Sequence, residues 1–130
     1  MGAAIEAARL LIEDRSQVTN RAYTPTLVLV SDGQPTDDVS RPLKALLDSE
    51  RGRKATRLAL AIGDDADISC LQRFIASPEI PVIRAQEVAR IRDFFRWVSL
   101  SMQTRSKSRN PDQQGALAPL TDFNEADILF

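Results

Sequence analysis

The sequence contains no histidine. Catalytic triads, Cys–His pairs and most zinc sites need an imidazole as a base or as a ligand, so the residues of this sequence cannot form any of these sites. Any chemistry would have to use carboxylates, hydroxyls, Lys and Arg, or a hard cation held by oxygen atoms.

Cysteine and long apolar runs are also scarce. Cys70 is the single cysteine, which leaves no partner for an internal disulfide and fits a reducing compartment. It lies in an apolar helical pattern, which predicts a buried, unreactive thiol. The N-terminus lacks the basic and apolar regions of a signal peptide, and no apolar run is long enough to span a bilayer. We therefore expect a cytoplasmic protein.

An excess of charge of either sign is missing as well. The 17 Lys and Arg residues nearly balance the 18 Asp and Glu residues, which gives a net charge of -1. This balance predicts neither nucleic acid nor a membrane surface as a partner. The 130 residues, 43% hydrophobic and 27% charged, suit one ordinary globular domain.

Apolar periodicity predicts helices and strands in strict alternation along most of the chain. Helices are expected over residues 2–14, 39–52, 68–75 and 85–102, and strands over Thr26–Ser31, Arg57–Ile62 and Val82–Ile83. Alternation at these lengths predicts right-handed crossovers and a parallel sheet flanked by helices, which is an α/β fold.

The composition changes from Thr104 onward to Ser, Arg, Asn, Pro and Gln without periodicity. We therefore predict one domain over residues 1–106 and a flexible C-terminal tail over residues 107–130. The tail ends in a mixture of acidic and apolar residues that allows two interpretations. It either docks on a partner or on the domain itself, or it is a mobile end without function.

The loop after the first predicted strand is the most informative segment, with the sequence Ser31-Asp32-Gly33-Gln34-Pro35-Thr36-Asp37. Ligands of open parallel sheets bind at the carboxyl ends of the strands, where this loop lies. Ser31, Asp32 and Asp37 offer the oxygen atoms that Mg²⁺ prefers. The alternative is structural: Asp37 or Asp38 caps the following helix and Asp32 closes a turn.

This strand and loop resemble the part of von Willebrand factor A domains that carries the last element of their metal-ion-dependent adhesion site. The matching run is Leu27-Val28-Leu29-Val30-Ser31-Asp32-Gly33-Gln34-Pro35-Thr36-Asp37. Asp32 takes the metal-associated position, which often acts through water. The opening Met1-Gly2-Ala3-Ala4-Ile5 resembles the helix that follows the family's metal-binding threonine. Residues 83–108, with Asp93-Phe94-Phe95-Arg96-Trp97-Val98-Ser99, resemble the closing helix of the bacterial tellurite-resistance-associated (TerY-type) subfamily.

The match departs from the family at its start. The resemblance implies that an Asp-x-Ser-x-Ser loop and a threonine hold the cation, and neither is present. We therefore expect a C-terminal portion of a Rossmann-like domain, a truncated product or fragment, in which Mg²⁺ binding is weak or absent. The missing first strand would leave Thr26–Ser31 with an apolar unpaired edge, which favours aggregation, a partner strand or self-association between copies.

The resemblance implies a non-catalytic protein-interaction module. Its partners would be kinase-like and phosphatase-like proteins of tellurite-stress resistance or phage-defence gene sets. The alternative is a fragment of a Mg²⁺-dependent phosphatase, because Ile62–Ile68 resembles the Gly-Asp acidic motif of haloacid dehalogenases. That family also needs a nucleophilic Asp-x-Asp, and Asp32 is followed by Gly33 and Gln34. We prefer a turn in which Asp67 lies at a helix N-terminus.

Overall fold

The computed structural model describes residues 1–14, 25–106 and 117–130. Its elements follow the predicted alternation, with one added helix and an added C-terminal strand. In chain order they are α1 (Gly2–Glu13), β1 (Thr26–Ser31), α2 (Ser40–Asp48), α3 (Glu50–Lys54), β2 (Thr56–Ile62), α4 (Ile68–Ile75), β3 (Val82–Ala85), α5 (Val88–Ser106), the 3-10 turn η1 (Glu125–Asp127) and β4 (Ile128–Leu129). Nowhere in these ranges does a helix combine the length and the apolarity that crossing a membrane requires.

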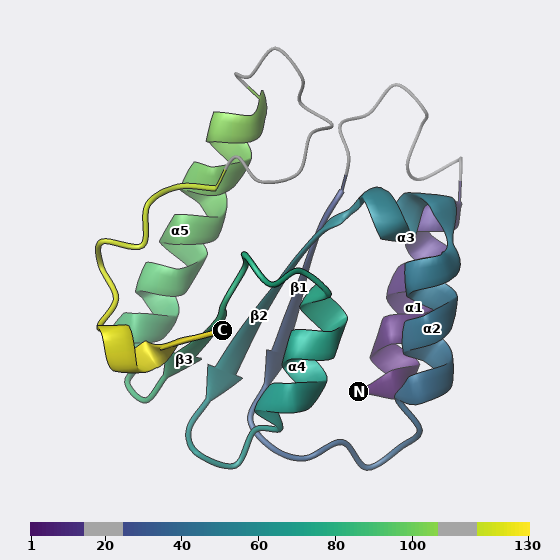
Figure 1. Ribbon diagram of the computed structural model, residues 1–130, viewed down its shortest axis with the longest axis horizontal. Coiled ribbons are helices and arrows are strands. Elements are labelled where there is room, and N and C mark those ends of the chain that lie inside the picture. The colour runs from purple at the N-terminus through teal and green to yellow at the C-terminus, as the bar shows by residue number, and fades with distance from the viewer. Residues whose placement is uncertain (15–24, 107–116) are drawn as a thin grey trace.

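The four strands form one sheet in the order β1-β2-β3-β4 (Figure 1). β1 and β2 pair in parallel, as do β2 and β3, whereas β4 runs antiparallel to β3. The predicted α/β class and parallel pairing are therefore confirmed. The antiparallel β4 was not predicted, because its two residues are too short to give a periodic signal.

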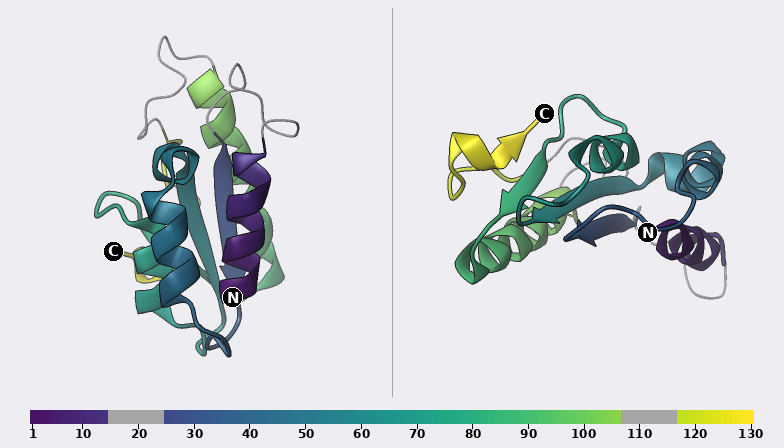
Figure 2. Two further views of the ribbon diagram at one scale, coloured as in Figure 1. Left: turned by 90° about the vertical axis from the view of Figure 1, so that its right-hand side faces the viewer. Right: turned by 90° about the horizontal axis from the view of Figure 1, so that it is seen from below.

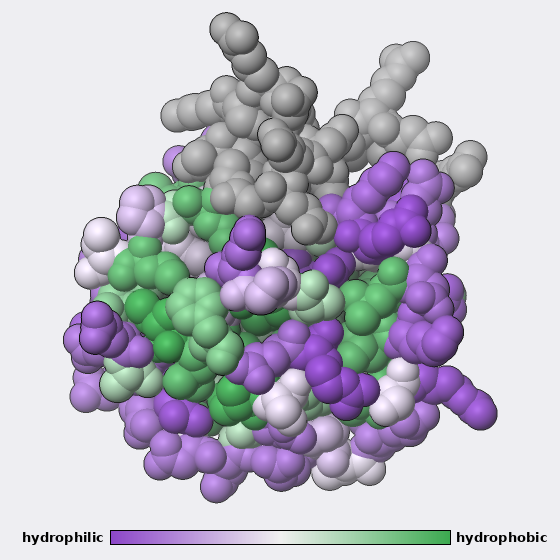
Figure 3. Space-filling model, viewed as in Figure 1, coloured by the Kyte–Doolittle hydropathy of each residue, from purple (hydrophilic) through white to green (hydrophobic). Residues whose placement is uncertain are grey.

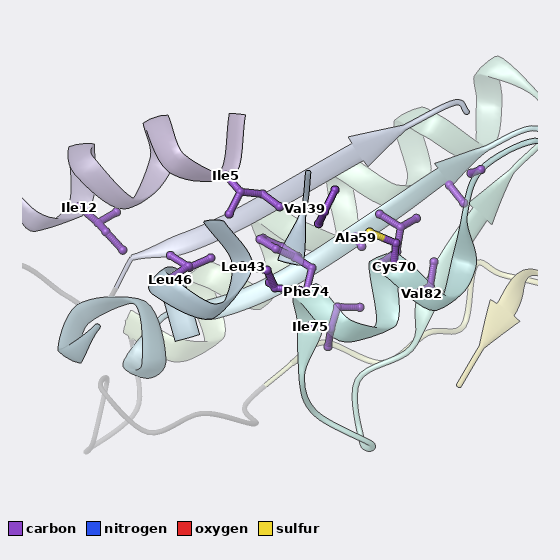
Figure 4. Close-up of a cluster of buried hydrophobic side chains, with 13 residues drawn as sticks. Ile5, Ile12, Val39, Leu43, Leu46, Ala59, Cys70, Phe74, Ile75 and Val82 are labelled. Atoms are coloured by element: carbon purple, nitrogen blue, oxygen red, sulfur yellow. The ribbon is translucent and has the colours of Figure 1, made fainter. Parts of the chain in front are cut away.

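Helices cover both faces of the sheet, with α4 on one side and α5 on the other (Figure 2, right). On the α4 side, Ile5 and Ile12 of α1 meet Leu43 of α2 and Phe74 of α4 in one buried cluster (Figure 4). A second cluster lies between the sheet and α5, and it consists of Leu58, Leu60, Ile83, Ala85, Phe94, Trp97, Val98 and Phe123. Coverage of both faces explains why the central strand β2 is apolar at nearly every position.

β1 is the terminal strand of the described sheet, as the sequence analysis predicted. The strand contains no charged residue and no proline that would discourage pairing. Val30 on this strand is 43% exposed, and Leu11 of the neighbouring α1 is 56% exposed. The described residues therefore leave an apolar edge on this side of the molecule.

Residues 117–130, the end of the predicted tail, pack on the domain, which is one of the interpretations that the sequence left open. Phe123 is buried in the second cluster, and Ile128 pairs with Ile83 in the sheet. The physical reason is that a few irregularly spaced apolar side chains anchor this segment, and such anchors give no periodicity. The rest of the predicted tail, residues 107–116, lies outside the described residues.

Candidate functional site

Loops after three neighbouring strands are linked by side-chain hydrogen bonds at the carboxyl end of the sheet. Gln34, in the loop after β1, donates from Nε2 to the carbonyl oxygen of Asp65 after β2, at 2.9 Å. Gln86, after β3, donates from Nε2 to Oδ1 of Asp64, also at 2.9 Å. Neither glutamine was predicted from the sequence, because a neutral amide on a loop does not stand out in a sequence pattern.

Asp37 fixes this loop to the start of α1. Its Oδ1 accepts hydrogen bonds from the backbone N–H of Gly2 at 2.8 Å and from the amino group of Met1 at 3.2 Å. Its Oδ2 accepts from the backbone N–H of Ala3 at 2.9 Å. The two backbone N–H groups, and then the amino group, lower the pKa of the Asp37 carboxyl to about 2.

Neither role predicted for Asp37 describes these contacts. It was expected as a metal ligand or as a cap of the following helix, but both of its oxygens bind the N-terminus of a helix that precedes it in the chain. At the start of α2, the acceptor is instead Asp38, whose Oδ1 accepts a hydrogen bond from the N–H of Ser40 at 3.1 Å. Sequence proximity favoured the following helix, and only the packing of α1 against this loop brings the other N-terminus near.

Ser31 and Asp32 lie beside a hollow next to α1. Ser31 Oγ donates to the carbonyl oxygen of Gly33 at 3.0 Å within the turn, and Asp32 is exposed. The hollow measures about 280 Å³ and is bounded by Met1, Ala4, the end of β1 and residues 31–36. Within the described ranges no group of three acidic, cysteine or histidine side chains is close enough to hold a metal ion. Asp37, the third of the predicted oxygen donors, does not line this hollow and is engaged by the N-terminus of α1.

The acidic turn after β2 is structural. Asp67 is the N-cap of α4, and its Oδ1 accepts from the N–H of Cys70 at 3.1 Å and from Ser69 Oγ at 2.8 Å. The Cys70 N–H, followed by the Ser69 hydroxyl, lowers the pKa of the Asp67 carboxyl. The predicted position of Asp67 at a helix N-terminus is confirmed. Cys70 is buried, as predicted, and this burial raises the pKa of its thiol.

Comparison with known proteins gives no family for this chain. No family model matches it, and the search of curated proteins returns no match. The resemblance to von Willebrand factor A domains therefore rests on the sequence motifs alone.

The Asp37 contacts predict an acid-sensitive attachment of α1. Because the folded pKa is lower than the ordinary value of about 3.9, the bond stabilises the fold above about pH 4 and is lost as pH falls toward about 2. We expect Asp37→Asn to lower the thermal unfolding midpoint at neutral pH, and the difference from the wild type to vanish near pH 2. Asp65→Asn, which changes an exposed carboxylate at the same end of the sheet, serves as the control. A difference between Asp37→Asn and the wild type that persisted undiminished at low pH would contradict this prediction.

Proposed function

We propose that this chain is a non-catalytic, cytoplasmic protein-interaction module of the von Willebrand factor A type, with a Rossmann-like sheet and an incomplete metal-ion-dependent adhesion site. One contact supports this most directly. Two segments that resemble the family at separate places in the sequence, the Ser31–Asp37 loop and the Met1-Gly2 helix start, meet through the bond between Asp37 and Gly2. An adhesion site built from both segments would require this contact.

The type of pairing in the sheet gives further support. Parallel pairing of β1, β2 and β3 places the Ser31–Asp37 loop at the carboxyl edge, where open α/β sheets bind ligands. Two carboxylates near this edge are already engaged, Asp37 by the N-terminus of α1 and Asp67 by that of α4. We propose that protein partners, such as the kinase-like and phosphatase-like proteins that the resemblance implies, are bound without a firmly held metal.

Magnesium should therefore leave thermal stability nearly unchanged. A ligand present at a hundred times its dissociation constant stabilises a fold by about 2.7 kcal/mol. We expect millimolar MgCl₂ to shift the unfolding midpoint no more than NaCl of the same ionic strength, in the wild type and in Asp32→Ala alike. An upward shift that magnesium alone produces and that Asp32→Ala abolishes would contradict the proposal that the metal site is incomplete.

The phosphatase alternative has less support from the geometry. Its acidic motif would need carboxylates free to hold Mg²⁺, but Asp67 caps α4 and Asp64 accepts a hydrogen bond from Gln86. Turnover of a generic phosphate ester by the folded protein, lost in Asp32→Asn, would favour the phosphatase. We expect no turnover.

A further inference from the structure

Residues 117–130, here called the C-terminal arm, bind the domain through backbone groups near their start. The carbonyl oxygen of Ala118 accepts a hydrogen bond from the indole Nε1 of Trp97 at 2.8 Å, and the N–H of Ala118 donates to Ser101 Oγ at 2.9 Å. Farther along, the carbonyl oxygen of Asp122 accepts from Nη1 of Arg90 at 2.9 Å. Three side chains of α5 therefore hold the backbone of the arm, which leaves much of its sequence free to vary.

The central anchor of the arm is aromatic. Phe123 is 9% exposed and lies edge-to-face against Trp97, with the ring centroids 6.4 Å apart. Trp97 in turn lies against Phe94 in the second core cluster, at 5.9 Å. Paired aromatic rings of this kind dominate the affinity of many binding surfaces.

The arm ends by adding a strand to the open edge of β3. Ile128 and Leu129 pair antiparallel with Ile83 and Val82, and this places β4 at the end of the sheet. Strand addition at an edge, with anchors in neighbouring pockets, is a common way for domains to bind extended peptides.

The groove is not completely filled by the arm. A hollow of about 210 Å³ lies between the start of the arm and Trp97, Ile80 and Pro81, and a second of about 240 Å³ lies beside Phe130. Phe130 is 71% exposed. Apolar surface extends over the part of the molecule where the arm lies in Figure 1 (Figure 3). The groove therefore has room for apolar side chains larger than those that the arm supplies.

We propose that the groove between the β3 edge and α5 is a peptide-binding site, which the C-terminal arm fills in cis and which an extended segment of a partner protein fills in trans. The partner segment would share the chemistry of the arm: two leucine-like side chains in the places of Leu117 and Leu120, which pack against the second cluster, an aromatic ring for Trp97 and a short apolar strand. It would carry acidic rather than basic residues, because the arm contains Asp122, Glu125 and Asp127 but no Lys or Arg, and Arg90 of the domain lies beside it, at the carbonyl oxygen of Asp122. This inference deepens the proposed function, since it names the surface at which an interaction module would bind.

Trp97 is the single tryptophan and therefore reports directly on the groove. In the full chain, Phe123→Ala should release the arm and shift the Trp97 emission to longer wavelength, because water then reaches the indole. Phe130→Ala, which truncates the exposed phenylalanine of the same arm, is the matched control and should leave the emission unchanged. An unshifted emission in folded Phe123→Ala would contradict the proposal that the arm is a ligand that can leave the groove.

A synthetic peptide of residues 117–130 tests binding in trans. It should return the emission of Phe123→Ala to that of the wild type in a saturable way, and a peptide that carries Phe123→Ala should not. The wild-type chain should not respond at about 0.1 mM peptide, because a tethered arm competes at an effective concentration in the millimolar range. If the folded variant shows no response to the wild-type peptide, the groove is part of the core and not a binding site.

Two further measurements keep the outcomes separate. If Phe123→Ala loses its circular dichroism spectrum, Leu120→Ala replaces it as the milder release of the arm. Light scattering gives the mass of the wild type, and a dimer that the peptide dissociates would show that a second copy supplies the arm, which overturns the cis arrangement. The magnesium titration does not involve this groove, so the proposed adhesion-type function and the peptide site can fail independently.

Discussion

Replacing Arg57 by methionine should lower the free energy of unfolding by about 3 kcal/mol or more, because several buried carbonyl groups lose their donors at about 1–3 kcal/mol each. Arg57 is 6% exposed at the start of β2. Its Nε donates to the carbonyl oxygens of Phe74 at 2.9 Å and Ile75 at 3.2 Å. Its Nη1 donates to those of Gly52 and Ala55.

These acceptors are the last carbonyls of two helices, α3 and α4. A helix C-terminus carries partial negative charge, so one guanidinium neutralises two helix ends at once. Burial lowers the pKa of the Arg57 guanidinium, but arginine stays charged in proteins. Its fork of donors is therefore the feature that matters, and lysine, with a single ammonium, cannot reach both helix ends.

The measurement is urea unfolding followed by Trp97 fluorescence and circular dichroism. Arg41→Met, on the exposed side of α2, is the matched control and should change the free energy of unfolding by no more than about 0.5 kcal/mol. Arg57→Lys should fall between this control and Arg57→Met. Equal stability of Arg57→Met and Arg41→Met would show that the buried guanidinium contributes nothing.

Arg57 also shows where prediction from the sequence stops. The run Arg57–Ile62 was correctly predicted as a strand, because its apolar residues and its length are local properties. The partners of the guanidinium lie on α3 and α4, and they depend on how those helices end near the start of β2. No local sequence pattern shows that these two helix ends lie next to Arg57.

The helix predicted over residues 39–52 is a smaller example of the same limit. The structure divides it into α2 and α3 at Ser49, whose Oγ accepts from the N–H of Gly52 at 3.0 Å and donates to the carbonyl oxygen of Leu46 at 2.9 Å. Ser49 is thus the end of one helix and the N-cap of the next. Residues 48–54 contain no apolar side chain, so periodicity could not locate the break.

The candidate site was predicted in position but not in its bonding. The order of elements correctly placed the Ser31–Asp37 loop at the carboxyl edge of the sheet, since parallel pairing follows from the crossovers. The partners of Asp37 and Gln34 lie 35 and 31 residues away in the sequence, so they required the packed structure. The same holds for Phe123, which is an isolated aromatic residue in the sequence but lies against Trp97 in the structure.

Gly2→Ala should lower the free energy of unfolding by about 1–3 kcal/mol, the usual cost of overpacking. A Cβ at this position would lie 2.0 Å from the carbonyl oxygen of Asp38 and 3.2 Å from Oδ2 of Asp37. Either the backbone at Asp38 moves or α1 retracts, and both movements disturb the bond from the Gly2 N–H to Asp37. Alanine is the better helix former by about 1 kcal/mol, and this gain does not offset a clash with backbone.

Gly33→Ala is the matched control on the other side of the same junction. Nothing lies within 4 Å of its Cβ position, so this substitution should be neutral or slightly stabilising. Combining Gly2→Ala with Asp37→Asn then shows whether the clash stays local or also breaks the contact between α1 and the loop. If Gly2→Ala already displaces α1, adding Asp37→Asn should cost less than it does in the wild type, because the two substitutions break the same contact. Strictly additive losses would mean that α1 stays docked in Gly2→Ala and that the Asp38 backbone moves instead.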